Sequence, residues 1–129
     1  MAEERKPSNP LRDPESAPYW AAAERGVLLL KRCRACGKPH YFPRPLCPFC
    51  MSADTEWVEA KGQGEIYSFT VLRRAAPPYA VAYVTLDEGV RVLTNIVGGD
   101  FDALRIGQGV SLAFQLSENG SPIAMFTPA

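Results

Sequence analysis

Two closely spaced cysteine pairs, Cys33-x-x-Cys36 and Cys47-x-x-Cys50, constrain the fold of this chain more than any other feature. Each pair places two sulfurs within one tight turn, and ten residues separate the pairs. Four thiolates at this spacing are typical of a structural zinc site with tetrahedral geometry. A redox dithiol uses a single Cys-x-x-Cys on a thioredoxin-like βα unit, which is not apparent here. We therefore predict that the four cysteines bind one structural Zn²⁺, with no coordination position left open for catalysis.

The remaining sequence divides into segments on either side of this predicted ribbon. Residues 1–14 are polar and rich in proline, which predicts a flexible arm. In residues 15–52, an alanine-rich helix over 15–25 precedes a strand over 27–32 and the two cysteine turns. Residues 53–129 are predicted to form a small β-barrel, because short β segments recur between turn residues. Those segments are residues 55–60, 64–73, 79–86, 90–97 and 110–116.

Hydrophobic alternation predicts how two of these strands face the barrel core. In residues 110–116 the apolar positions Val110, Leu112, Phe114 and Leu116 alternate with small or polar ones, which predicts one inner face. Residues 79–86 are apolar on both faces, which an exposed barrel wall does not need. We therefore expect the outer surface of that strand to be covered by something else.

Charge is unevenly distributed although the net charge is zero. Residues 25–50 carry six Lys or Arg and no acidic residue, whereas residues 51–129 carry five basic and nine acidic residues. The pattern predicts a basic ribbon and an acidic barrel, with the ribbon meeting an anionic partner first. The start of the chain lacks the apolar core of a signal peptide and no apolar run is long enough to span a membrane, so we expect a cytoplasmic protein.

A catalytic apparatus is not recognisable in the sequence. His40 is the single histidine and no acid that would orient it is visible, so we interpret it as structural or surface-exposed. No Gly-x-Ser-x-Gly elbow or Ser-x-x-Lys pair occurs, and Gly62-Gln-Gly64 is too short for a phosphate-binding loop. An independent enzyme is therefore a poorly supported hypothesis, although an unrecognised constellation stays open.

The order of motifs resembles a known family. The shared features are Tyr19-Trp20, Leu28-Leu29-Leu30-Lys31-Arg32-Cys33-x-x-Cys36-Gly37, Pro43-Arg44, Cys47-Pro-x-Cys50, Trp57, Gly62-x-Gly64-x-Ile66-Tyr67-Ser68-x-Thr70-Val71, Pro78-Tyr79 and Gly107-x-x-Val110. Together they resemble the DUF35 family of acyl-CoA-associated zinc-ribbon/OB-fold proteins. The resemblance implies a mainly β fold: an N-terminal helix and a rubredoxin-like zinc ribbon, followed by an OB-fold barrel.

The same resemblance implies an accessory role in acyl-CoA metabolism. Members of the family often act beside a thiolase-like or hydratase-like enzyme in a hetero-oligomer, and the catalytic residues then lie on that partner. Only the four zinc ligands transfer residue by residue. For a CoA thioester bound between ribbon and barrel, we expect Arg34, Lys38 and Arg44 to face its phosphates. A second, weaker anion-binding candidate is the edge formed by Arg73, Arg74 and Tyr79.

A single-stranded nucleic-acid binder is the main rival interpretation. OB barrels can present aromatic residues, here Tyr67 and Phe69, to successive bases. Such a surface also needs a positive track along the barrel, which an acidic barrel segment does not supply. The sequence therefore favours a protein partner over nucleic acid.

Overall fold

The computed structural model describes residues 6–10, 12–41 and 43–129. The predicted arm, residues 1–14, thus lies partly outside the described residues. A 3-10 turn η1 (Pro14–Ser16) and the helix α1 (Ala17–Glu24) lead into the ribbon strands β1 (Leu29–Cys33), β2 (Pro39–His40) and β3 (Thr55–Glu59). The remaining elements are β4 (Gln63–Leu72), β5 (Tyr79–Leu86), β6 (Arg91–Ile96), η2 (Phe101–Ala103), β7 (Gly109–Leu116) and β8 (Pro122–Pro128).

The predicted N-terminal helix is present, in two parts. Asp13 caps η1, because its side chain accepts a hydrogen bond from the backbone N–H of Ser16 at 2.8 Å. Pro18 lies in the first turn of α1, where its missing N–H costs nothing. Gly26 follows the helix with a φ of 80°, a conformation that ends helices and suits glycine. No helix among the described residues is long and apolar enough to cross a membrane.

The ribbon is a three-stranded antiparallel sheet in the order β2-β1-β3. Residues 55–60 were predicted to be the first barrel strand, and this prediction was wrong. β3 instead runs back along β1, with Leu30 opposite Val58 and Cys33 opposite Thr55. The strand forms as predicted, but its hydrogen-bond partner is the ribbon strand that precedes the first cysteine turn.

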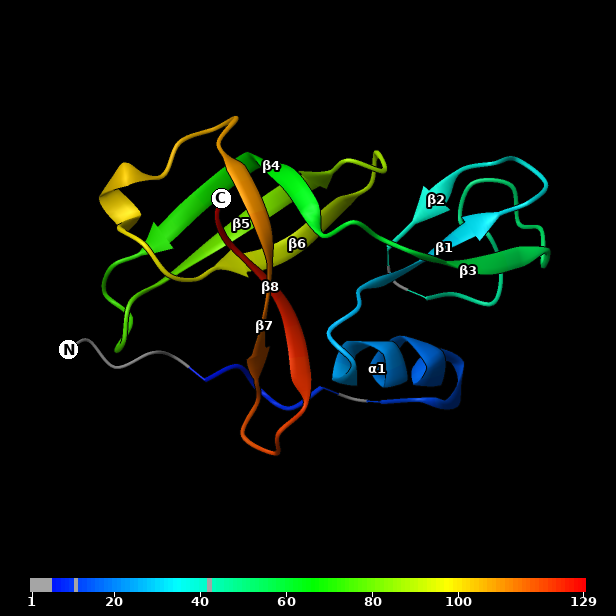
Figure 1. Cartoon of the computed structure of the whole chain (residues 1–129), viewed down its shortest axis with the longest axis horizontal. Coiled ribbons are helices and arrows are strands. Elements are labelled where there is room, and N and C mark those ends of the chain that lie inside the picture. The colour runs from blue at the N-terminus through cyan, green and yellow to red at the C-terminus, as the bar shows by residue number, and fades with distance from the viewer. Residues whose placement is uncertain (1–5, 11, 42) are drawn as a thin grey trace.

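The barrel is closed by five strands in the order β4-β5-β6-β8-β7. Its last strand, β8, was not predicted; it pairs antiparallel with β7 along its length and parallel with β6 at Ile96 and Phe126. The predicted inner face of β7 is only partly correct. Val110 is buried, but Leu116 at the far end is 62% exposed, where the β7-β8 hairpin leaves the barrel body (Figure 1).

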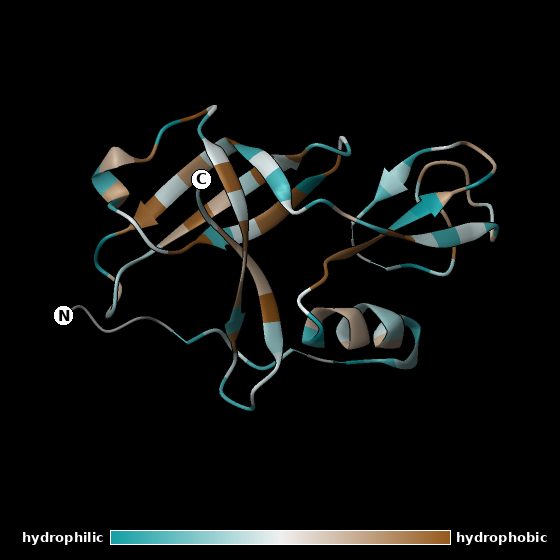
Figure 2. Cartoon of the chain, in the orientation of Figure 1, coloured by the Kyte–Doolittle hydropathy of each residue, from teal (hydrophilic) through white to brown (hydrophobic). Residues whose placement is uncertain are grey.

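One hydrophobic core joins the helix, the ribbon and the barrel. Trp20 of α1, Leu30 of β1 and Phe126 of β8 belong to the same cluster of buried side chains. α1 packs against both β1 and β8, so it lies between the ribbon and the barrel (Figure 1). Along the barrel strands, apolar bands alternate with polar ones, as expected for a wall with one buried face (Figure 2). The predicted mainly β architecture is confirmed.

Candidate functional site

The four predicted zinc ligands converge on one point. The sulfurs of Cys33, Cys36, Cys47 and Cys50 all lie within 4.8 Å of one another. The Sγ atoms of Cys33 and Cys50 are 3.6 Å apart, and those of Cys36 and Cys47 are 3.7 Å apart. A tetrahedron with Zn–S bonds of about 2.3 Å has sulfurs about 3.8 Å apart. The cysteines are therefore positioned for metal binding, and their spacing fits zinc.

Two equivalent turns hold the cysteines in place. The N–H of Gly37 donates to the carbonyl of Cys33 at 2.8 Å, and that of Met51 donates to the carbonyl of Cys47 at 2.9 Å. The first cysteine of each turn also accepts a backbone N–H at its sulfur, from Cys36 and from Phe49 respectively, both at 3.4 Å. These bonds stabilise thiolates, the form of cysteine that binds metal.

The pKa values of the two buried cysteines agree with this role. The backbone N–H of Cys36 is the main cause of a lowered pKa at Cys33. At Cys47, burial raises the pKa, but hydrogen bonds from the N–H groups of Cys50 and Phe49, together with those to the Cys36 and Cys50 thiols, lower it to about 7. A thiol that ionises near neutral pH is prepared for metal coordination.

The basic residues of the ribbon are less available than the sequence suggests. Arg34 forms ion pairs with Asp54 and Glu56 at 3.2 and 3.1 Å. Both carboxylates were counted with the acidic barrel, yet Glu56 belongs to β3 and Asp54 immediately precedes it. The barrel segment proper, residues 60–129, carries five basic and six acidic residues. The barrel is therefore acidic, as predicted, but by one charge rather than four, because part of the acidic charge lies on the ribbon sheet.

The other two ribbon cations have separate surroundings. Lys38 Nζ lies 5.1 Å from the ring centroid of Phe49, an exposed residue of the second cysteine turn. Arg44 lines a shallow hollow of about 410 Å³ together with Leu46 and Met51. The structure therefore does not gather Arg34, Lys38 and Arg44 around one cleft, and their assignment to a CoA ligand stays a prediction.

A larger cleft of about 680 Å³ lies at the opposite end of the molecule from the ribbon. Arg73 and Tyr79 line it, but Arg74 is not among its lining residues. Arg73 reaches across to Asp102 with an ion pair of 2.6 Å, which joins the β4-β5 connection to η2. Sequence reasoning found Arg73 and Tyr79 from their Pro-Pro turn, but it did not find the opposite wall around Phe101.

His40 is buried, with 6% of its surface exposed. Neither of its ring nitrogens has a hydrogen-bond partner among the described residues. Burial lowers the pKa of His40, and the positive charges of Lys31 and Arg44 lower it further. The ring is therefore neutral at physiological pH and packs as a core residue, in agreement with its interpretation as structural.

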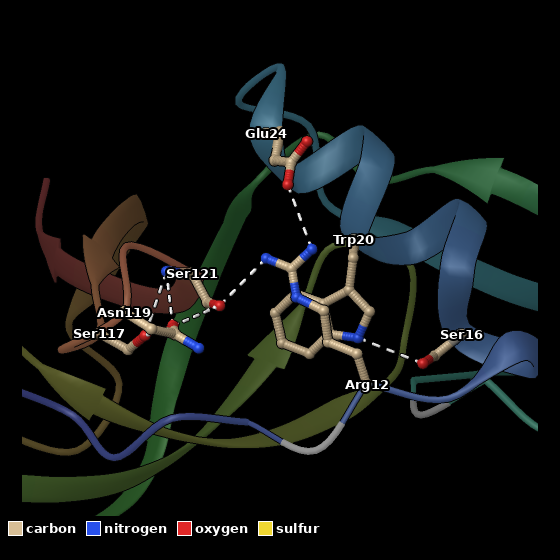
Figure 3. Close-up of polar contacts among 7 residues, drawn as sticks. All are labelled: Arg12, Ser16, Trp20, Glu24, Ser117, Asn119 and Ser121. Atoms are coloured by element: carbon tan, nitrogen blue, oxygen red, sulfur yellow. Dashed lines mark hydrogen bonds and ion pairs between the residues drawn. The ribbon is translucent and has the colours of Figure 1, made fainter.

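The described part of the N-terminal arm is fastened to the β7-β8 turn (Figure 3). Arg12 donates to Ser121 Oγ at 3.1 Å, forms an ion pair with Glu24 at 3.1 Å, and places its guanidinium 4.9 Å from the ring centroid of Trp20. Trp20 in turn donates from its indole N–H to Ser16 Oγ at 3.2 Å. The arm thus connects α1 to the barrel; the sequence predicted a loose arm that orders only against another surface, and it did not indicate which surface.

Comparisons with known proteins match both halves of this architecture. The family described as the ChsH2 rubredoxin-like zinc ribbon domain matches residues 20–56, and that described as the ChsH2 C-terminal OB-fold domain matches residues 57–115. A DUF35 domain-containing scaffold protein of Methanothermobacter thermautotrophicus is 34% identical over 99 residues, covering 71% of this chain and 74% of that protein. This chain belongs to the DUF35 family.

Two further relatives are named as enzyme subunits. A probable enoyl-CoA hydratase alpha subunit of Thermomonospora curvata is 37% identical over 120 residues, 89% of this chain, but the chain spans only 38% of that relative's length. The benzoylsuccinyl-CoA thiolase subunit BbsA of Geobacter metallireducens is 30% identical, covering 74% of this chain and 68% of that subunit.

Among solved structures, the Ltp2-ChsH2(DUF35) aldolase matches with a TM-score of 0.79 and 35% identity, covering 93% of this chain and 98% of that one. A DUF35-family protein of unknown function from Sulfolobus solfataricus matches with a TM-score of 0.66 at 16% identity, covering 90% of this chain and 86% of that one. The second likeness concerns the fold alone.

Proposed function

We propose that this DUF35 protein is a non-catalytic accessory subunit that binds a thiolase-like enzyme of acyl-CoA metabolism, with Cys33, Cys36, Cys47 and Cys50 holding a structural Zn²⁺. The observation that carries the proposal is the match over 93% of the chain to the ChsH2(DUF35) component of an aldolase complex. The thiolase-like class of the partner is supported by the BbsA relatives, which are named as thiolase subunits.

The chemistry of the chain agrees with a supporting role. Its single histidine is buried without a hydrogen-bond partner among the described residues, so it is poorly placed to act as a general base. Its four cysteines converge on one metal position. A Cys₄ zinc site has no open position for water or substrate, so the zinc would stabilise the ribbon only.

A hydratase-like partner is the second candidate. The hydratase alpha subunit of Thermomonospora curvata aligns over 89% of this chain, and the remaining length of that relative lies outside the alignment. A fusion of a DUF35 segment with a hydratase segment would be one way to keep the two together.

The test is an affinity purification of the tagged chain from its native cytosol, with mass spectrometry and a zinc assay on the same eluate. We expect a stoichiometric thiolase-like or hydratase-like subunit and about one zinc per chain. Acyl-CoA turnover by the purified chain alone, or absence of such a subunit, would contradict the accessory role. A metal-free eluate from a folded chain would contradict the zinc assignment independently.

We further propose that the cleft at Arg73 and Tyr79, rather than the ribbon, contacts the CoA thioester. Its volume of about 680 Å³ lies in the usual range for small-molecule sites. Pro78, Tyr79 and Phe101 supply apolar walls, and Gln115 brings an amide to the lining. This composition suits a pantetheine arm, which is apolar and carries amide groups. A phosphate at the rim would compete with Asp102 for the guanidinium of Arg73.

Variants at the two ends of the molecule distinguish the candidate sites. In the purified complex with the partner, we expect Arg73→Ala to weaken CoA binding by at least fivefold in calorimetry. Lys38→Ala in the ribbon should leave the affinity within twofold, as should the control Arg105→Ala. If only Lys38→Ala lowered the CoA affinity, the CoA site would lie on the ribbon.

A further inference from the structure

Three large apolar side chains gather on the outer face of β4, β5 and β6. Tyr67 is 50% exposed, Tyr83 47% and Leu93 57%. Tyr83 and Leu93 are direct cross-strand partners, and Ser68, the residue after Tyr67, pairs with Tyr83 on its other side. The strand residues that alternate with them, such as Val84 and Val92, are buried in the barrel. The three side chains therefore form one patch, here called the outer apolar face.

Arg91 borders this face and stacks on the ring of Tyr67. Its guanidinium carbon lies 3.8 Å from the ring centroid of Tyr67. Arg91 is absent from the four ion pairs found among the described residues. Aromatic rings beside an arginine are the composition most enriched at the energetic centres of protein interfaces. A carboxylate from outside the chain would complete the contacts of Arg91.

The chain covers a different side of its own barrel. α1 packs against β8, and the N-terminal arm bonds to the β7-β8 turn through Asn9 and Arg12. Neither α1 nor the described part of the arm reaches the outer side of β4, β5 and β6 (Figure 1). The barrel is closed, so it offers no free strand edge for a partner to extend. A partner that binds the barrel must therefore recognise side chains, and the two tyrosines of the outer apolar face are the largest exposed apolar side chains of the barrel strands.

The charge of this face favours a protein partner over nucleic acid. β4, β5 and β6 contain one basic residue, Arg91, and one acidic residue, Glu65. A nucleic-acid surface needs a track of several cations along the strands. With Arg91 as its one cation and Glu65 as its one anion, the face instead complements a largely apolar protein surface, on which a carboxylate would pair with Arg91.

We infer that the outer apolar face, centred on Tyr83 and Leu93, docks the catalytic subunit through an apolar patch and a carboxylate that pairs with Arg91. The inference rests on the proposed function, because it assigns the surface used by the partner proposed there. It also explains why the sequence of β5 is apolar on both faces: one face fills the barrel and the other meets the partner.

The experiment uses the full chain and the thiolase-like or hydratase-like subunit identified by affinity purification, each purified and then mixed. Binding is measured by calorimetry for the wild type, Leu93→Asp and Arg91→Glu. Leu116→Asp is the matched control, since Leu116 is 62% exposed and lies at the far end of β7, away from β4, β5 and β6. Circular dichroism and zinc content of each variant establish that the fold is retained. We expect Leu93→Asp to weaken binding at least thirtyfold, Arg91→Glu at least tenfold and Leu116→Asp less than twofold.

The outcomes separate the two proposals. If the wild type binds the subunit and folded Leu93→Asp binds equally well, the docking face is wrong and the accessory role stands. If the wild type binds no such subunit, the accessory role fails and the docking face fails with it. Concentration-dependent dimers of the chain alone that Leu93→Asp abolishes would assign the face to a second copy and overturn the inference, as would binding of a single-stranded oligonucleotide that Arg91→Glu abolishes.

Discussion

Gly37 and Met51 occupy the same position in the two cysteine turns, but only one of them is glycine. Both have a positive φ, 77° and 67° respectively, and each donates its N–H to the carbonyl of the first cysteine in its turn. This left-handed conformation is disfavoured for a residue with a side chain, by about 1–2 kcal/mol. The two turns therefore have the same backbone conformation, but only Met51 is strained by it.

Replacing Met51 by glycine should relieve that strain. The Met51 side chain is 66% exposed, so little packing is lost. Because glycine also has more freedom in the unfolded chain, we expect Met51→Gly to raise the free energy of unfolding by about 0.5–1 kcal/mol. Urea denaturation of the zinc-loaded protein measures the change.

The opposite substitution at the equivalent position is the control. A Cβ at Gly37 would meet no atom within 4 Å, so Gly37→Ala changes the backbone preference without a clash. It should lower the free energy of unfolding by about 1 kcal/mol. If both Met51→Gly and Gly37→Ala had the wild-type free energy of unfolding, the backbone at Met51 would not be strained.

Among the elements, strand formation could be predicted from the sequence more reliably than strand pairing. Residues 55–60 were correctly predicted to form a strand, as a short β segment between turn residues, but a local pattern does not indicate which neighbouring strand it pairs with. β8 was missed because Pro122 and Pro128 bound it and its buried residues, Met125 and Phe126, are adjacent rather than alternating. Both prolines are tolerated at the ends of the strand, where ladder bonds are fewest.

The cysteine site was predictable because its ligands are local, whereas the cleft and the arm contacts were not. Each cysteine pair is fixed by one turn, so spacing alone indicates the chemistry. Arg73 and Asp102, in contrast, meet only because the barrel closes, and they lie 29 residues apart. Arg12 and Ser121 are 109 residues apart, a separation that no motif encodes.

The contacts of Arg12 give the N-terminal arm a testable role. Arg12→Gln removes the ion pair with Glu24 and the cation over Trp20, which are partly exposed and therefore screened by solvent. We expect the free energy of unfolding to fall by about 1 kcal/mol. The amide of Asn119, which donates to Asn9 Oδ1 at 2.8 Å, should exchange faster with deuterium as the arm detaches.

Arg25→Gln serves as the comparison, because Arg25 is exposed at the end of α1 and takes part in none of the four ion pairs among the described residues. It should leave both stability and Asn119 exchange near the wild-type values. An arm that stays equally protected in Arg12→Gln would show that Arg12 does not hold it.

At the scale of the whole molecule, the ribbon and the barrel share a core but depend on different forces. The core cluster contains Leu28, Leu29 and Leu30 from the start of the ribbon, together with α1 and the barrel. The cysteine turns, residues 33–37 and 47–51, contribute no side chain to that cluster. Their large apolar residues Phe49 and Met51 are exposed instead. These turns therefore need the metal, because they lack an apolar core of their own.

Removal of zinc should consequently unfold the turns and spare the barrel. With a strong chelator at neutral pH, we expect hydrogen–deuterium exchange to become fast at the amides of Gly37 and Met51, which are bonded within the turns. Amides of β5 and β6 should remain protected, since the barrel closes through its own strands. Added zinc should restore the turns, and Cys36→Ser should reproduce the chelated state. Simultaneous loss of protection in the turns and in β5 would instead mean that the shared core makes the molecule one cooperative unit, with the metal supporting the barrel as well as the ribbon.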